Sequence, residues 1–105
     1  MIEKILRNYL EIKSLNELKN KKKPNDKYIV KKVSSEDFQL NKFFYKQIGK
    51  NHQWNDRLAW DDKKWIDYVS NSAVFTFVLK DSENIAGFFE LIYHKEKSEV
   101  EIAYF

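Results

Sequence analysis

Cysteine is absent from the 105 residues of this chain, which contain only two glycines, one proline and two arginines. Without cysteine the chain cannot form a disulfide, use a thiol nucleophile or bind a metal through sulfur, and its composition suits a reducing compartment. No apolar run approaches the roughly 20 residues that a membrane-spanning helix needs, and the N-terminus has no signal-peptide pattern. These absences predict a cytoplasmic protein without a membrane association.

Positive charge comes mainly from lysine, because Arg7 and Arg57 are the only arginines and the formal net charge is +3. Bidentate contacts to phosphates and bases favour arginine, so the nucleic-acid signal is not strong. His52 and His94 lie 42 positions apart without helical spacing, which indicates single surface histidines and no metal site.

The composition, with 43% hydrophobic and 16% aromatic residues, is typical of one globular domain or part of one. Apolar residues in 1–18 fit helical spacing, but residues 9–13 also alternate like a strand, so both structures stay open. Residues 19–26 are charged, contain the proline and indicate a solvated linker. The chain therefore divides into an N-terminal strand or helix with its linker (1–26) and a main fold (27–105).

The main fold is predicted to start with a strand at 27–33, which is rich in β-branched residues. A helix follows, with Ser34 as its N-cap and Asp37 at position N3 in a capping-box-like pattern. Gly49 is the expected left-handed residue at its end. A second helix is predicted at 62–69, capped by Asp61 and with a buried face formed by Trp65, Ile66 and Val69.

Three strands close the sequence, at 74–80, 85–93 and 99–105, and the short polar segments between them suit hairpin turns. The order β-α-α-β-β-β with an antiparallel meander predicts an α+β (mixed α/β) fold. In the last strand, Val100, Ile102 and Tyr104 alternate with Glu99, Glu101 and Ala103. No following segment covers this strand, so the chain is expected to be the front part of a larger fold.

Four segments resemble one bacterial branch of the GNAT superfamily of acetyl-CoA-dependent N-acetyltransferases. They are FFY at 43–45, WNDRLAW at 54–60, GFFEL at 87–91 and EVEIAYF at 99–105. The resemblance covers residues 9–105 and implies the N-terminal half of a GNAT-like fold, with an additional strand at 9–12. It implies a transferase that moves acetyl from acetyl-CoA to a small-molecule amine or an amino-terminal substrate.

The Gly-rich turn and helix that hold the CoA pyrophosphate in that family are absent, since Gly49 and Gly87 do not form a Gly-x-Gly arrangement. The 105 residues alone are therefore expected to bind acetyl-CoA weakly and to show little or no activity. By resemblance, the backbone of Tyr104 and Phe105 would begin the contact with acetyl-CoA, in an oxyanion-stabilising role.

Glu101 is the first candidate for catalysis, because an amine must lose a proton before it attacks a thioester and a partly buried carboxylate can accept that proton. The resemblance implies this role for Glu101 on the last strand; the alternative is an ordinary surface carboxylate. Glu90 is a possible second carboxylate, and the strand register decides whether it shares a face with Glu101.

Four residues lie between the helices, in a region that by resemblance helps to form the wall of the acceptor site: Trp54, Asp56, Arg57 and Trp60. Aromatic rings beside an arginine can bind a planar or anionic group. The alternative is structural, since large aromatics often fix a long loop to the core.

Two other functions stay open at this stage. One is a small basic binding module for nucleic acid or a protein partner, using strand aromatics and lysines. The other is a chain that adds its last strand to a partner's sheet.

Overall fold

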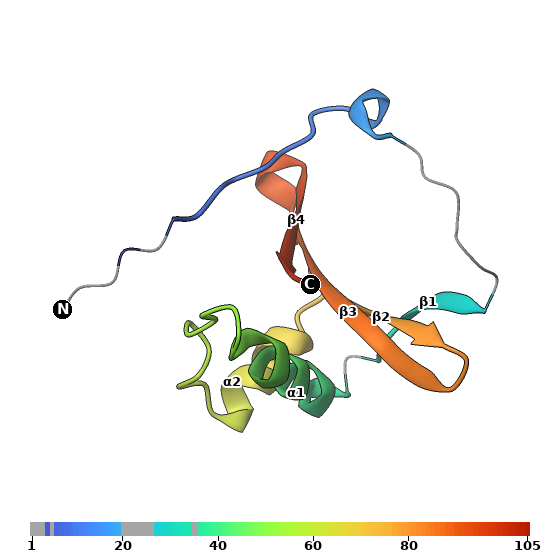
Figure 1. Cartoon of the computed structure of the whole chain (residues 1–105). Helices are drawn as coiled ribbons and strands as arrows, with labels where there is room; N and C mark the ends of the chain where they lie inside the picture. Colours follow the sequence, from blue (N-terminus) through green and yellow to red (C-terminus); the bar gives the residue numbers. More distant parts are fainter. Residues whose placement is uncertain (1–3, 5, 20–26, 35) are drawn as a thin grey trace.

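A four-stranded antiparallel sheet with two α-helices on one face forms the main part of the chain (Figure 1). The computed structural model describes residue 4 and residues 6–19, 27–34 and 36–105. The strands are β1 (Tyr28–Lys32), β2 (Val74–Asp81), β3 (Asn84–His94) and β4 (Glu99–Tyr104), in the sheet order β1-β2-β3-β4. The helices are α1 (Phe38–Gly49) and α2 (Asp62–Val69). The predicted α+β class and the antiparallel meander are confirmed.

The described residues before β1 form neither the α-helix nor the strand that the sequence allowed. Their only regular element is η1, a 3₁₀ turn at Leu15–Glu17 that Ser14 and Glu17 cap reciprocally. Leu6 is 85% exposed and Leu10 94% exposed, so these apolar side chains have no packing surface. Without such a surface an isolated amphipathic pattern does not form a stable helix or strand. Residues 20–26 of the predicted linker lie outside the described residues.

Helix α1 begins later than the sequence predicted. Its N-cap is Asp37, whereas Ser34 belongs to a preceding turn in which its hydroxyl accepts a hydrogen bond from the Glu36 N–H at 3.3 Å. The predicted end at Gly49 is correct, but no glycine in the described chain has a positive φ. Gly49 is needed for another reason: a Cβ there would lie 2.7 Å from the Cβ of Trp54.

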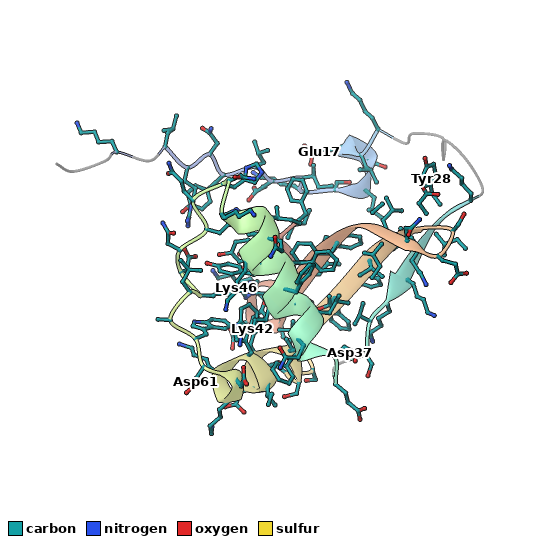
Figure 2. All side chains as sticks on the ribbon, turned by 60° about the horizontal axis from the view of Figure 1, so that its bottom comes forward. Glu17, Tyr28, Asp37, Lys42, Lys46 and Asp61 are labelled. Atoms are coloured by element: carbon teal, nitrogen blue, oxygen red, sulfur yellow. The ribbon has the colours of Figure 1, made fainter. Side chains whose placement is uncertain are left out.

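Helix α2 has the predicted bounds and the predicted cap. Asp61 accepts a hydrogen bond from the Lys64 N–H at 2.9 Å (Figure 2 labels Asp61 at the start of α2). Trp65 and Val69 are buried as predicted, four residues apart on one helical face. Ile66 is 45% exposed, because one residue along a helix turns the side chain away from that face.

Strand β4 contains a β-bulge that breaks the alternation expected from the sequence. Ala103 is the extra residue, and it opposes no residue of β3. The neighbouring register pairs are Ile92 with Glu101, Leu91 with Ile102, and Glu90 with Tyr104. Because Glu90 and Ile92 share a face, Glu101 and Tyr104 also share one, and it is the face that the helices cover. Tyr104 therefore lies opposite to the face of Ile102, which contradicts the regular pattern predicted for 99–105.

Aromatic residues dominate the core between the helices and the sheet. Tyr45 and Trp65 are almost fully buried, and their ring centroids are 5.8 Å apart in an edge-to-face contact. Tyr104 reaches this core from β4, with its ring 5.3 Å from that of Tyr45. The helices are also joined at their surface, where Lys42 Nζ lies 2.9 Å from Asp62 Oδ1. In the described part of the chain, no helix has the length and apolar character needed to cross a membrane.

Candidate functional site

A buried polar network crosses the interface between the sheet and both helices, centred on the fully buried Glu90 of β3. Its Oε2 accepts hydrogen bonds from Arg57 at 2.9 Å and from the Tyr68 hydroxyl at 2.8 Å. Its Oε1 accepts one from Asn41 Nδ2 at 3.1 Å, and Asn41 also donates to the Thr76 hydroxyl at 2.8 Å. We call these five residues the Glu90 network. Buried charges are tolerated only when they are paired and hydrogen-bonded in this way.

Arg57 comes from the loop between the helices and is only 6% exposed. Its guanidinium carbon lies 4.3 Å from the ring centroid of Tyr68, 4.5 Å from that of Tyr104 and 4.9 Å from that of Trp60. Burial lowers the pKa of Arg57, but the Glu90 carboxylate and Tyr68 outweigh that effect and raise it overall. Arg57 is therefore a permanent cation held among aromatic rings.

The same network fixes the loop and keeps Tyr68 protonated. The backbone N–H of Arg57 donates to the Tyr45 hydroxyl at 2.9 Å, which ties the loop to α1. Burial, and then the adjacent Glu90, raise the pKa of Tyr68 well above its ordinary value. Since donors surround Glu90 and no solvent reaches it, this carboxylate is placed to anchor the loop and the sheet, with no access for a substrate proton.

Next to the Glu90 network, the loop between α1 and α2 meets β4 at the surface of the protein. Asp56 is exposed, and its Oδ2 accepts a hydrogen bond from the Tyr104 hydroxyl at 2.8 Å. The ring of Trp54 lies 4.5 Å from that of Tyr104. We call Trp54, Asp56 and Tyr104 the Asp56 surface. Burial, and then the hydrogen bond to Asp56, raise the pKa of Tyr104, so its hydroxyl stays a donor at neutral pH.

Glu101 lies further along β4 and forms a pair with His94. Their contact, Nε2 to Oε1, measures 2.8 Å, and the side chains are 39% (His94) and 54% (Glu101) exposed. His94 lies at the surface as predicted, and it is in addition a partner of the candidate base. Glu101 is half-exposed, whereas Glu90 is the fully buried carboxylate.

The predicted site residues thus separate into two groups. Arg57 and Glu90 meet inside the protein, and Trp60 packs against the Arg57 guanidinium. Asp56 and Glu101 stay accessible, on the loop and on β4. At the end of the sheet, β4 stops at Tyr104, and Phe105 is 79% exposed.

Four residues of the site were not identified from the sequence: Asn41, Tyr68, Thr76 and His94. Asn41 carried a usable signal, because it lies one helical turn before Tyr45 on the face of α1 that carries the core. An amide on a buried helical face needs partners, and here it finds them in Thr76 and Glu90. The partners of Tyr68 and His94 depended on contacts between elements, which no local pattern specifies.

No protein-family model, curated protein or solved structure matches this chain. The function is therefore argued from the residues and geometry described above.

Proposed function

We propose that this chain carries the acceptor-binding half of a GNAT-type N-acetyltransferase, which transfers acetyl from acetyl-CoA to a primary amine. The resemblance of the four sequence segments supports this function, and so does the element order of two helices between β1 and an antiparallel meander. The observation that carries the proposal is the bulge at Ala103 in β4.

A bulge takes one residue out of the regular ladder, so its peptide groups can be directed to a ligand. Backbone N–H groups in such a position can stabilise the oxyanion that forms when an amine adds to a thioester carbonyl. The bulge at Ala103 also brings Glu101 and Tyr104 to one face of the sheet. A base, a hydroxyl donor and an irregular backbone segment therefore lie together at the end of β4.

In this reaction the chain must position the amine and remove its proton. Glu101, or a water that it orients, accepts the proton that the ammonium group loses, and His94 holds the Glu101 carboxylate at 2.8 Å. The neutral nitrogen then forms a bond to the acetyl carbon, the carbon–sulfur bond breaks, and the CoA thiolate leaves. The second N–H proton of the nitrogen, which is lost as the amide forms, passes through water to the thiolate. Asp56 and Trp54 would line the acceptor side, while the Glu90 network holds their loop.

The test is an NMR titration of ¹⁵N-labelled chain with acetyl-CoA. We expect weak binding, with a Kd in the millimolar range, and shifts centred on the amides of residues 103–105. Deleting Ala103 should abolish these shifts, because Tyr104 can keep its pairing with Glu90 while the bulge disappears. Ala86 provides a matched control, since it is the extra residue of a second bulge, between β2 and β3.

Deletion of Ala86 should leave the acetyl-CoA shifts in place. The proposal is contradicted if the intact chain shows no shifts, if deletion of Ala103 leaves them unchanged, or if binding is micromolar. Micromolar binding would mean that the cofactor contact lies elsewhere in these residues.

A further inference from the structure

Asp56 and Arg57 are consecutive residues, but only one of their charges is accessible. The Arg57 guanidinium is buried against Glu90 at 2.9 Å, so its positive charge is balanced inside the protein. Asp56 is exposed, and the Tyr104 hydroxyl that donates a hydrogen bond to it is neutral. The sequence suggested that an arginine beside aromatic rings could bind an anionic group. The structure favours a cationic ligand instead, because a ligand that approaches this loop meets the Asp56 carboxylate.

The rings beside Asp56 favour a cation as well. Trp54 and Tyr104 lie 4.5 Å apart with their planes tilted by 56°. The face of an aromatic ring attracts an ammonium or guanidinium group, and tryptophan does so most strongly. A carboxylate next to two such rings is a suitable environment for an organic cation.

The chain's own N-terminal segment already brings a cation near this surface. Arg7 is fully exposed, and its pKa is raised, first by Tyr9 and then by Asp56. Tyr104 adds a smaller electrostatic effect of the same sign. The guanidinium of Arg7 therefore interacts favourably with the same two residues that would bind an external cation.

A second carboxylate lies on the same face. Glu101 opposes Ile92 and Tyr104 opposes Glu90, so the two positions on β4 are separated by two residues of β3, or about 7 Å. The two carboxylates cannot have the same role in an acetyl transfer. A carboxylate that binds an ammonium group favours its protonated form, whereas the attacking nitrogen must be neutral.

We propose that the Asp56 surface binds a second, non-reacting ammonium group of the acceptor, and that the acceptor is a diamine whose other nitrogen reaches Glu101. This inference rests on the proposed function, because it assigns the acceptor class of that reaction. It gives Asp56 the binding role, places the aromatic side chains of Trp54 and Tyr104 beside the bound cation, and gives Glu101 the proton transfer.

The test is an NMR titration of the full chain without acetyl-CoA, using 1,4-diaminobutane, 1-aminobutane and 4-aminobutanoate. The diamine should shift the Trp54 indole and Tyr104 amide signals. It should bind up to about fivefold more tightly than the monoamine, as expected for an added exposed ion pair. The aminobutanoate should bind most weakly, since its carboxylate faces Asp56 or Glu101.

Asp56→Asn tests the site itself, because asparagine keeps an oxygen that can accept from Tyr104 but removes the charge. It should abolish the preference for the diamine, and Arg7→Ala should lower the Kd by removing the competing guanidinium. Asp67→Asn, an equal change of charge at an exposed residue of α2, should leave the preference intact. Equal binding of monoamine and diamine, or an unchanged preference in Asp56→Asn, overturns the inference.

The result is separable from the proposed function. If the diamine binds through Asp56 but acetyl-CoA causes no shifts near Ala103, the cation site stands and the acetyltransferase proposal fails. If acetyl-CoA binds at Ala103 and the diamine shows no preference, only the acceptor class is wrong.

Discussion

The Glu90 network and the Asp56 surface are adjacent, yet they use charge in opposite ways. In the Glu90 network, Arg57 is 6% exposed and its ionic partner, Glu90, is fully buried. On the Asp56 surface, the carboxylate is exposed and accepts a hydrogen bond from a neutral hydroxyl, that of Tyr104, at 2.8 Å. The difference shows that one short run of aromatic and charged residues can fix a loop through one charge and leave the neighbouring charge exposed. The charge that looks most suited to a ligand, Arg57, is the one that the fold requires.

The largest expected effect comes from breaking the Glu90 network. Glu90→Gln removes the negative charge and leaves Arg57 buried without its ionic partner, which should lower the free energy of unfolding by about 3–5 kcal/mol. Urea denaturation monitored by tryptophan fluorescence measures this loss. Glu101→Gln removes the same charge from a half-exposed side chain and should cost at most about 1 kcal/mol. Similar losses in the two variants would mean that Glu90 is not the anchor.

A smaller effect is expected where the two regions meet, at the contact between Gly49 and Trp54. Gly49→Ala places a Cβ 2.7 Å from the Trp54 Cβ, and overpacking of this kind costs about 1–3 kcal/mol. The displaced indole should also weaken diamine binding at the Asp56 surface. Gly87→Ala is the matched control, because a Cβ there meets no atom within 4 Å. A stable Gly49→Ala variant with unchanged fluorescence would show that this contact does not position Trp54.

The N-caps of the two helices differ in their hydrogen bonds, and comparing them tests how much the Asp61 cap stabilises α2. Asp61→Ala removes the hydrogen bond to the Lys64 N–H and should lower the free energy of unfolding by about 1 kcal/mol. Asp37→Ala should cost less, because the Asp37 side chain makes no capping hydrogen bond to α1. Thermal denaturation of both variants gives the comparison. An equal loss at Asp37 would show that electrostatics, and not the hydrogen bond, governs the caps.

The smallest effect should appear at alkaline pH, where both regions respond through a tyrosine. The pKa values of Tyr68 and Tyr104 are raised above the ordinary value of 10.0 in the folded chain. The folded state thus keeps protons that the unfolded state loses, so stability is fully present below about pH 10 and declines as the pH rises further. Thermal melts from pH 8 to 11 measure this decline, and Tyr68→Phe should make it shallower. An identical decline in Tyr68→Phe would exclude a contribution from this residue.

The sequence predicted the elements of the main fold because their signals are local. Alternating apolar residues defined β2 and β3 within one residue, and the Asp61 cap defined the start of α2. The bulge at Ala103 could not be predicted, because the sequence of 99–105 alternates regularly whether or not a bulge is present. The extra residue changes only which residues of β3 and β4 pair with each other. The segment at 1–18 was ambiguous because its periodicity matched two structures, and nothing in the local sequence shows whether a packing surface exists for either.

The candidate site was predicted in its members but not in its arrangement. The cluster Trp54, Asp56, Arg57 and Trp60 was identified from its place between the helices and from the family resemblance, but the path of the loop decides which side chains face the core. Glu90 and Glu101 were both identified, and the register then placed Glu90 in the interior and Glu101 beside His94. Such outcomes depend on tertiary pairing of residues far apart in the sequence.

The central claim is that Arg57 stabilises the fold and that its neighbour Asp56 is an exposed group available for binding. The most direct test compares the free energies of unfolding of Arg57→Met and Asp56→Asn. Arg57→Met strands the buried Glu90 carboxylate and should cost about 3–5 kcal/mol. Asp56→Asn alters an exposed group and should cost less than about 1 kcal/mol. Equal losses, or a larger loss at Asp56, would contradict the assignment of Arg57 to the structure and Asp56 to binding.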